Sequence, residues 1–194
     1  FYSGALLNGT AREVSAALAD LALLTGNIGI AGGGLRPLRG EGNSQGASDM
    51  GFSPDLLPGY RPLSQQDVHA SFESAWGVPV PVEAGLPLET LSLVIDQGSV
   101  AAVYVMAEAG NVTSISSGLK EALKKVPFLV VQEVFANELT DLAHVVLPGA
   151  AFAEKDGTYT NFERRIQRLV KAKESAGKAK SGWEIICAIA QTMG

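Results

Sequence analysis

The sequence predicts an α/β fold in which a parallel sheet is covered by helices on both faces. Three short apolar segments, at 101–106, 128–134 and 144–147, indicate strands because they are rich in valine, leucine and aromatic residues. Helical segments separate them, and strands that are apolar throughout are typical of parallel sheets buried on both sides. Ligands of such sheets bind beyond the carboxyl ends of the strands, so a site is expected at that edge.

The composition is that of a globular protein with a hydrophobic core. Of the 194 residues, 46% are hydrophobic and 18% are charged, and the formal net charge is -5. An acidic chain is a poor match for nucleic acid, whose phosphates require a concentrated basic face. The one dense basic run, 163–168, is interpreted as a solvated face or an internal contact. The sequence has no apolar run of about 18 residues, so no direct membrane insertion is expected.

Local signals define the elements of the first half. A capping box at Thr10 and Glu13 predicts a helix that ends at Gly26. A glycine-rich stretch, 27–59, follows and predicts a long loop that could bring its backbone close to a phosphate or a flat heterocycle. It is neither a Walker loop nor a Gly-x-Gly-x-x-Gly fingerprint after a strand. Ser64 is expected to cap the next helix.

The second half alternates helices with the three strands and ends in a capped helix. Ser181 and Glu184 form a second capping box, which predicts a helix at 183–193. A stretch at 166–170 is expected to be extended. The other predicted elements are helices at 88–97, 118–125 and 137–142 and a turn at Gly110-Asn111.

Few residues suggest chemistry when they are considered one by one. Glu133 ends the second strand, where a carboxylate can accept hydrogen bonds from a ribose or a guanine. A structural cap is the other interpretation of Glu133, and both stay open. The single cysteine, Cys187, is expected in the core of the last helix, and His69 and His144 are expected to be structural or exposed. No metal site and no nucleophile are predicted.

Several blocks of sequence follow one another in an order that is more specific than any single motif. The blocks are 21–29, 37–51 with Pro37-Leu38-Arg39-Gly40-Glu41-Gly42, 58–60 with Pro-Gly-Tyr, 147–161, 163–165 and 183–186. They resemble the molybdopterin oxidoreductases, in particular formate dehydrogenase alpha (catalytic) subunits and the large iron–sulfur subunit of bacterial NADH-quinone oxidoreductase. The chain begins at Phe1 rather than at methionine, and the resemblance makes an internal fragment the expected interpretation.

The resemblance implies a Rossmann-like fold inside a larger multidomain oxidoreductase. Residues 1–41 would end the preceding α/β domain, 42–153 would form the domain that binds molybdopterin guanine dinucleotide with molybdenum or tungsten, and 154–194 would return toward the iron–sulfur-proximal region. The family's metal-ligating cysteine or selenocysteine and the cysteines of a 4Fe-4S cluster would lie upstream. The isolated segment is therefore not expected to be active.

The resemblance also implies partners and a location. The expected partners are the remaining domains of the same polypeptide and iron–sulfur or NADH-oxidising subunits, without nucleic acid. The expected location is the cytoplasm, with any membrane association made through partner subunits.

The same resemblance assigns site residues. Arg39 matches the arginine that orients the formate carboxylate beside the metal in formate dehydrogenases, a task that suits a planar guanidinium. Pairing of Arg39 with the pterin or a nearby carboxylate is the alternative. Glu41, also expected at the cofactor, stands where those enzymes usually have glutamine. The positions expected to line the guanosine end of the cofactor are Ala109, Thr113, Gln132, Glu133 and Gly149.

Three functions therefore remain open. The first is part of an enzyme that oxidises formate to carbon dioxide and passes two electrons to iron–sulfur clusters, favoured by Arg39 and the Pro-Gly-Tyr block. The second is a structural and electron-transfer role in an NADH-quinone oxidoreductase subunit, favoured by Glu41 and the run Asn43-Ser44-Gln45-Gly46. The third is a separate nucleotide-binding or interaction module without catalysis.

Overall fold

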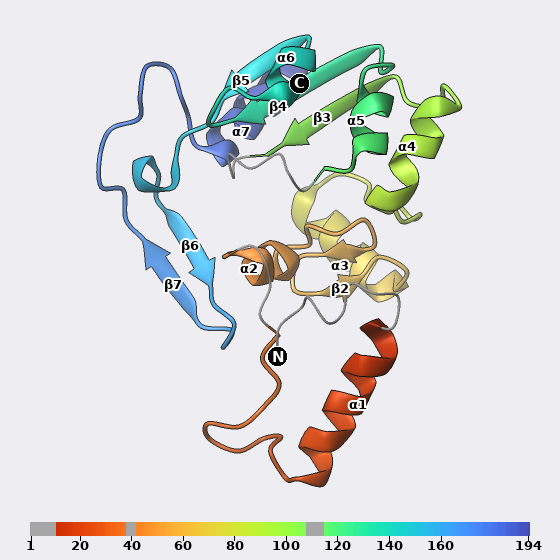
Figure 1. Ribbon diagram of the computed structural model, residues 1–194, viewed down its shortest axis with the longest axis vertical. Helices are drawn as coiled ribbons and strands as arrows, with labels where there is room; N and C mark the ends of the chain where they lie inside the picture. The colour runs from red at the N-terminus through yellow and green to blue at the C-terminus, as the bar shows by residue number, and fades with distance from the viewer. Residues whose placement is uncertain (1–10, 38–41, 108–114) are drawn as a thin grey trace. The chain divides into compact units, whose positions relative to one another are not determined.

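The computed structural model describes residues 11–37, 42–107 and 115–194 (Figure 1). Thr10 of the predicted capping box and the predicted turn at Gly110-Asn111 lie outside these residues. The described chain forms two compact units. The first unit holds the residues up to 83 together with 158–168, and the second unit holds 84–157 and 169–194. The predicted boundaries after residues 41 and 153 concern the domains of the whole polypeptide and stay a prediction.

The second unit is built on a parallel sheet of three strands in the order β3-β4-β5. Met106 pairs with Gln132, and Gln132 pairs with Leu147, so the carboxyl ends of all three strands lie at one edge. The α/β class and the parallel pairing are thereby confirmed. The strands are β3 Ala102–Met106, β4 Phe128–Glu133 and β5 Val145–Pro148. The helices of this unit are α4 Leu88–Asp96, α5 Ser117–Leu123, α6 Glu138–Leu142 and α7 Gly182–Met193.

One face of this sheet packs against α4, α5 and α6 (Figure 1). Leu129 and Val131 of β4 point to this face and are 0% exposed, and Val103 and Val105 of β3 pack beside them. Complete burial of one such side chain stabilises a fold by about 1.5–3 kcal/mol. This cluster is therefore the main apolar core of the second unit. Its helical members are Ile95 of α4, Leu119, Ala122 and Leu123 of α5, and Leu139 of α6.

The opposite face of the sheet is covered less completely. α7 lies beside β5 there, where Leu147, Ile185 and Ile189 line an apolar groove of about 500 Å³. Tyr104 and Met106 on the same face remain 40% and 39% exposed. The predicted cover of helices on both faces is thus only partly observed, because α7 lies at the β5 side of the sheet.

Cys187 of α7 is exposed, so the expectation of a core cysteine is wrong. The helix buries only Gly182 and Ile185, while Trp183 and Met193 are 63% and 83% exposed. The spacing of apolar residues correctly predicts a helix. It does not determine whether a neighbouring segment covers the apolar side of that helix.

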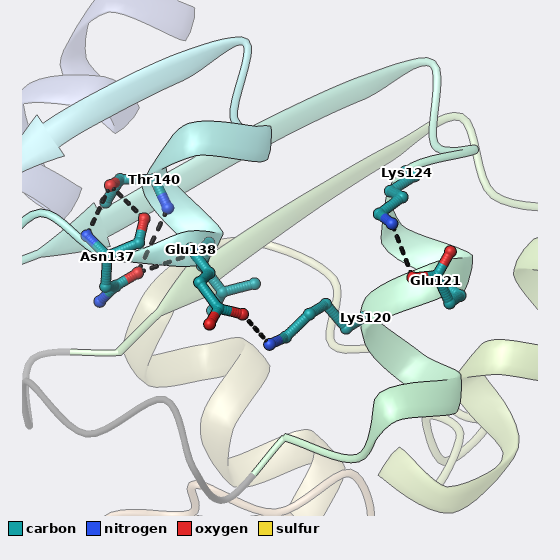
Figure 2. Close-up of polar contacts among 7 residues, drawn as sticks. Lys120, Glu121, Lys124, Asn137, Glu138 and Thr140 are labelled. Atoms are coloured by element: carbon teal, nitrogen blue, oxygen red, sulfur yellow. Dashed lines mark hydrogen bonds and ion pairs between the residues drawn. The ribbon is translucent and has the colours of Figure 1, made fainter.

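Local hydrogen bonds begin α6 and α7. Figure 2 shows the start of α6, where the Asn137 side chain accepts the N–H groups of Leu139 (2.9 Å) and Thr140 (3.3 Å). The Thr140 hydroxyl in turn accepts the Asn137 N–H at 2.9 Å. At α7 the Ser181 N–H donates to the Glu184 carboxylate at 2.8 Å. The predicted helix at 137–142 and the second capping box are both confirmed.

An ion pair joins α5 to α6 (Figure 2). Lys120 donates to the carboxylate of Glu138, and this hydrogen bond, followed by the Lys120 charge, lowers the pKa of Glu138. The Glu138 side chain is 73% exposed, so water screens the pair strongly. The contribution of this pair to stability is therefore small.

The first unit begins with α1, Ala11–Leu24. The helix stops where predicted: Gly26 has φ +68°, and the Asn27 N–H returns to the Ala22 carbonyl at 2.8 Å. α3 spans Gln66–Trp76, and Gln65 rather than Ser64 occupies the N-cap position, without a side-chain cap. The prediction of a Ser64 cap is wrong by one residue, because a side chain can cap only from the position where the helical backbone begins.

The glycine-rich stretch contains more structure than the predicted loop. It holds α2, Ser44–Asp49, and half of a small antiparallel pair, β1 Leu56–Leu57 with β2 Arg61–Pro62. In α2 the Gln45 amide donates to Asp49 at 2.9 Å, across one helical turn. Serine, glycine and asparagine are weak helix formers, so the local sequence alone does not predict this helix. The core of the first unit is small and consists of Leu57, Leu63, Val68 and Val80.

Two strands near the end of the chain, β6 Gly157–Thr160 and β7 Ile166–Leu169, form a hairpin in which they run in opposite directions (Figure 1). The extended stretch predicted from residue 166 is confirmed. The turn between the strands belongs to the first unit. Within the described ranges, no helix has both the length and the apolar character that crossing a membrane requires.

Candidate functional site

The predicted site residues divide into two groups. Arg39, Glu41, Ala109 and Thr113 lie outside the described residues. The other three, Gln132, Glu133 and Gly149, come together at the carboxyl edge of the sheet in the second unit. The Gly149 N–H donates to the Glu133 carbonyl at 2.9 Å, and this bond continues the pairing of β4 with β5.

Glu133 is 3% exposed and anchors the loop that leaves β4. Its Oε1 accepts the Val134 N–H at 2.8 Å, and its Oε2 accepts from the Asn137 amide at 3.2 Å. Asn137 itself begins α6, so the carboxylate connects the strand end to the start of the next helix. This geometry supports the structural interpretation of Glu133, while a contact with a ligand stays a prediction.

Gln132 is 0% exposed and points away from the side chain of Glu133. Its side-chain oxygen accepts from the Tyr104 hydroxyl on β3, whereas Glu133 bonds to Asn137 beside α6. Neighbouring residues of a strand point to opposite faces of the sheet. The side chains of Gln132 and Glu133 therefore cannot both contact the same side of one small ligand.

A pocket of about 300 Å³ opens beside Glu133. Its lining residues are Glu133, Val134, Phe135, Ala136, Thr140, Val146 and Pro148. Phe135 is 66% exposed although it is a large aromatic residue. The sequence does not predict Phe135 as a site residue. The one signal in the sequence is its position, since this aromatic residue follows the acidic end of a buried strand by two positions.

A second convergence lies in the first unit, at the turn of the β6–β7 hairpin. Three contacts from other parts of the first unit reach this turn. Arg36 Nη1 lies 3.1 Å from Glu163 Oε1, and the Asn43 side chain accepts the Thr160 N–H at 2.9 Å. The third contact involves the Pro-Gly-Tyr block, since the Arg164 guanidinium lies 5.9 Å from the centre of the Tyr60 ring.

The contact between Asn43 and Thr160 joins residues that are 117 positions apart. Thr160 is 6% exposed, and a buried N–H that loses its acceptor costs about 1–3 kcal/mol. Gly46 leaves room for this contact, because a Cβ at position 46 would collide with the Asn43 side-chain oxygen. The Asn-Ser-Gln-Gly run therefore has a tertiary role that its order in the sequence does not reveal.

Glu154, in the family-like run after β5, has a structural role. It is 7% exposed, its Oε2 accepts the Ala151 N–H at 3.1 Å, and its Oε1 lies 3.0 Å from Lys173 Nζ. The hydrogen bond from Lys173 is the largest cause that lowers the pKa of the Glu154 carboxyl, and the Ala151 N–H adds to it. The carboxylate thus holds the segment after β5 against residue 173 of the tail.

The histidines show no sign of metal ligation. The His144 Nδ1 accepts the Leu129 N–H at 2.9 Å, which confirms a structural role for His144 at the start of β5. Over residues 11–37, 42–107 and 115–194, no three His, Cys, Asp or Glu side chains gather as a metal site.

The fold defines an α/β protein in which a parallel sheet carries a pocket at its carboxyl edge. A family model described as molybdopterin oxidoreductase matches residues 3–192. The chain belongs to the molybdopterin oxidoreductase family. It spans about a fifth to a quarter of the length of the curated relatives that it matches, 19% to 26%.

Three relatives illustrate the similarity. "Probable oxidoreductase YjgC" of Bacillus subtilis is 43% identical over 94% of this chain and 19% of its own length. The alpha subunit of F420-dependent formate dehydrogenase 1 of Methanococcus maripaludis is 42% identical over 90% of this chain and 26% of its own. The alpha subunit of F420-dependent formate dehydrogenase of Methanocaldococcus jannaschii is 42% identical over 92% of this chain and 26% of its own length. Among solved structures, acetylene hydratase of Pelobacter acetylenicus matches 73% of this chain and 17% of its own, at 18% identity and a TM-score of 0.42.

Proposed function

We propose that the whole protein is a formate dehydrogenase of the molybdopterin type and that this chain holds one molybdopterin guanine dinucleotide. The proposed reaction is the two-electron oxidation of formate to carbon dioxide, with the electrons passed to iron–sulfur clusters elsewhere in the protein. The observation that supports it most is the 42% identity to two alpha subunits of formate dehydrogenases over at least 90% of this chain.

The pocket beside Glu133 fits the nucleotide end of such a cofactor. Its volume of about 300 Å³ suits a base and part of a sugar rather than the whole dinucleotide. The Glu133 carboxylate is an acceptor for the N–H groups of a guanine. A carboxylate can accept about four hydrogen bonds, so its bonds to Val134 and Asn137 do not exclude a ligand. Phe135 adds an exposed ring on which a purine can stack.

Arg39 is the proposed substrate-binding residue. A guanidinium stays charged when it is desolvated, and its planar fork can donate two hydrogen bonds to the two oxygens of formate. Arg39 would thereby neutralise the carboxylate and direct the C–H bond toward the redox centre. The molybdopterin cofactor supplies the redox chemistry when it is bound. This role of Arg39 depends on the sequence motif, since residue 39 lies outside the described part of the chain.

Replacement of Arg39 tests the proposed reaction. In the whole, cofactor-loaded protein we expect Arg39→Lys to lower kcat/KM for formate about 10- to 100-fold, because a lysine keeps the charge but loses the two-pronged hydrogen bond. The measurement is formate-dependent reduction of an artificial electron acceptor. Arg168→Lys, an exposed position on β7, is the control and should leave the rate unchanged. A fully loaded wild-type protein that does not oxidise formate would contradict the proposal.

Replacement of Phe135 tests the proposed base pocket. We expect Phe135→Ala to weaken retention of the cofactor about 5- to 150-fold, since stacking of an aromatic ring on one base contributes about 1–3 kcal/mol. The guanine nucleotide and metal retained per protein after dialysis provide the measurement. Phe152→Ala is the matched control, because Phe152 is 67% exposed but is not among the residues that line this pocket. Equal retention by both variants would remove Phe135 from the site.

The NADH-quinone oxidoreductase alternative depends on Glu41 and the Asn43–Gly46 run, and the formate dehydrogenase relatives weigh against it. The upstream part of the polypeptide distinguishes the two functions. A cysteine or selenocysteine followed by histidine at the metal position supports formate chemistry, and its replacement by other residues supports a structural role.

A further inference from the structure

The apolar groove between β5 and α7 in the second unit combines aliphatic walls with positive charge. Its volume is about 500 Å³. Among the described residues, its charged lining residues are Lys178 and Lys180, and none of the lining residues is acidic. The aliphatic lining residues include Leu147 of β5 and Ile185, Ala188 and Ile189 of α7.

The two lysines find no carboxylate within the part of the chain that the structure describes. Both are exposed, and neither belongs to an ion pair with another described residue. The two acidic residues of the segment 169–194 have other contacts. Glu174 Oε2 lies 2.6 Å from Lys171 Nζ, and the Glu184 carboxylate accepts the Ser181 N–H at 2.8 Å. The ammonium groups of Lys178 and Lys180 are therefore open to carboxylates from elsewhere.

The backbone fixes Lys180 beside the end of β5. The Lys180 N–H donates to the Pro148 carbonyl at 3.2 Å, and the Lys180 carbonyl accepts the Ala150 N–H at 2.8 Å. Ala150 is 0% exposed, so this contact belongs to the interior of the unit. The position of Lys180 at the groove is thus set before anything binds, which lowers the cost of ordering on binding.

The exposed apolar surface of α7 extends beyond the groove. Trp183 and Ile186 do not line the groove, yet they are 63% and 48% exposed. Extended apolar patches with charged residues at their edge mark interaction surfaces. A small ligand in the groove would leave Trp183 and Ile186 in water, whereas a chain segment can cover them as well. The surface therefore favours a protein segment as the occupant.

We propose that the β5–α7 groove docks a segment from the remaining part of the same polypeptide. This segment presents apolar side chains to the groove and carboxylates to Lys178 and Lys180. The chain spans only 19% to 26% of the length of the relatives that it matches, so a whole protein of that size has ample chain to supply the segment. A segment of the same polypeptide also binds at a high effective concentration. The inference does not depend on formate chemistry.

Zero-length carbodiimide cross-linking of the whole protein tests the charge complementarity and the source of the segment together. The reagent joins an amine to a carboxylate in direct contact, and mass spectrometry of the peptides identifies both residues. We expect Lys178 or Lys180 to be joined to an aspartate or glutamate of the same polypeptide outside residues 1–194. A mixture of ¹⁵N-labelled and unlabelled protein distinguishes links within one molecule from links between two copies.

The cross-links can also overturn the proposal. Links of the two lysines only to carboxylates within residues 1–194 would mean that this chain fills its own groove. Links only to another subunit, or only between labelled and unlabelled copies, would mean a different occupant. No link at either lysine would mean that no carboxylate docks there.

Reversal of the lysine charges provides a second test. In the whole protein we expect Lys178→Glu/Lys180→Glu to accelerate hydrogen–deuterium exchange of the α7 amides about 3- to 10-fold, because attraction to the docked carboxylates becomes repulsion. The control is Arg165→Glu/Arg168→Glu, which makes the same change of charge at exposed positions of the first unit. Equal exchange of α7 in the two double variants would overturn the proposal.

A charge placed in the groove provides the third test. Ile189 is 37% exposed in this chain but would be covered by a docked segment, so we expect Ile189→Glu to accelerate exchange of the α7 amides about tenfold or more. Gln191→Glu adds the same charge to an exposed position of the same helix that does not line the groove, and should exchange as the wild type does. If Ile189→Glu also exchanges as the wild type does, no segment covers the groove.

Discussion

Replacement of Leu129 by alanine is expected to lower the free energy of unfolding of the second unit by about 2–5 kcal/mol. Leu129 is 0% exposed and lies at the centre of the cluster in which β4 packs against α4, α5 and α6. Truncation removes apolar contacts and leaves a cavity, and the backbone beside it cannot easily collapse. Leu129 exchanges two hydrogen bonds with His144, one through the His144 ring and one through its N–H, both at 2.9 Å.

Hydrogen exchange can measure this loss for the second unit alone. The amides of β4 should exchange faster in Leu129→Ala by the factor that corresponds to the lost free energy, about 1.4 kcal/mol for each factor of ten. Leu93→Ala on α4 is the matched control, since Leu93 is 59% exposed and its truncation should change little. If both variants change β4 exchange equally, Leu129 is not at the centre of this core.

Replacement of Gly51 by alanine is expected to destabilise the first unit by about 2–4 kcal/mol, the combined cost of backbone strain and overpacking. Gly51 has φ +79°, where a side chain is strained. A Cβ would also lie 2.7 Å from the Leu57 carbonyl carbon and 2.8 Å from the Pro58 nitrogen. Both are backbone atoms, so neither can rotate away. The chain would have to move just before Tyr60, on which Arg164 lies.

Gly77→Ala separates the two causes. Gly77 has a similar φ of +71° and belongs to the same unit, but a Cβ added there would meet no atom within 4 Å. Gly77→Ala should therefore lower the free energy of unfolding only by the cost of backbone strain, about 1–2 kcal/mol. Urea unfolding followed by exchange of first-unit amides compares the variants. An equal loss in Gly51→Ala and Gly77→Ala would show that the close approach to Leu57 and Pro58 has no cost.

Sequence and structure differ in what they could reveal about the site. Motif order in the sequence predicts Glu133 and Gly149 at a strand end, and the structure brings their backbones together. Because successive side chains of a strand point to opposite faces, Gln132 and Glu133 are expected on different sides of the sheet. The structure shows the hydrogen-bond partner of each side chain, Tyr104 for Gln132 and Asn137 for Glu133. The sequence does not predict Phe135 as a site residue, because its exposure beside the pocket is a property of the tertiary structure.

Elements whose signals are local can be predicted from the amino-acid sequence. Apolar runs predicted the three strands, and the box of Ser181 with Glu184 predicted the last helix, because caps and periodicity act within a few residues. The exposure of Cys187 and the hydrogen bond between Asn43 and Thr160, which are 117 positions apart, depend instead on tertiary packing. Such contacts depend on which surfaces pack together, and packing joins residues whose separation along the chain carries no local signal.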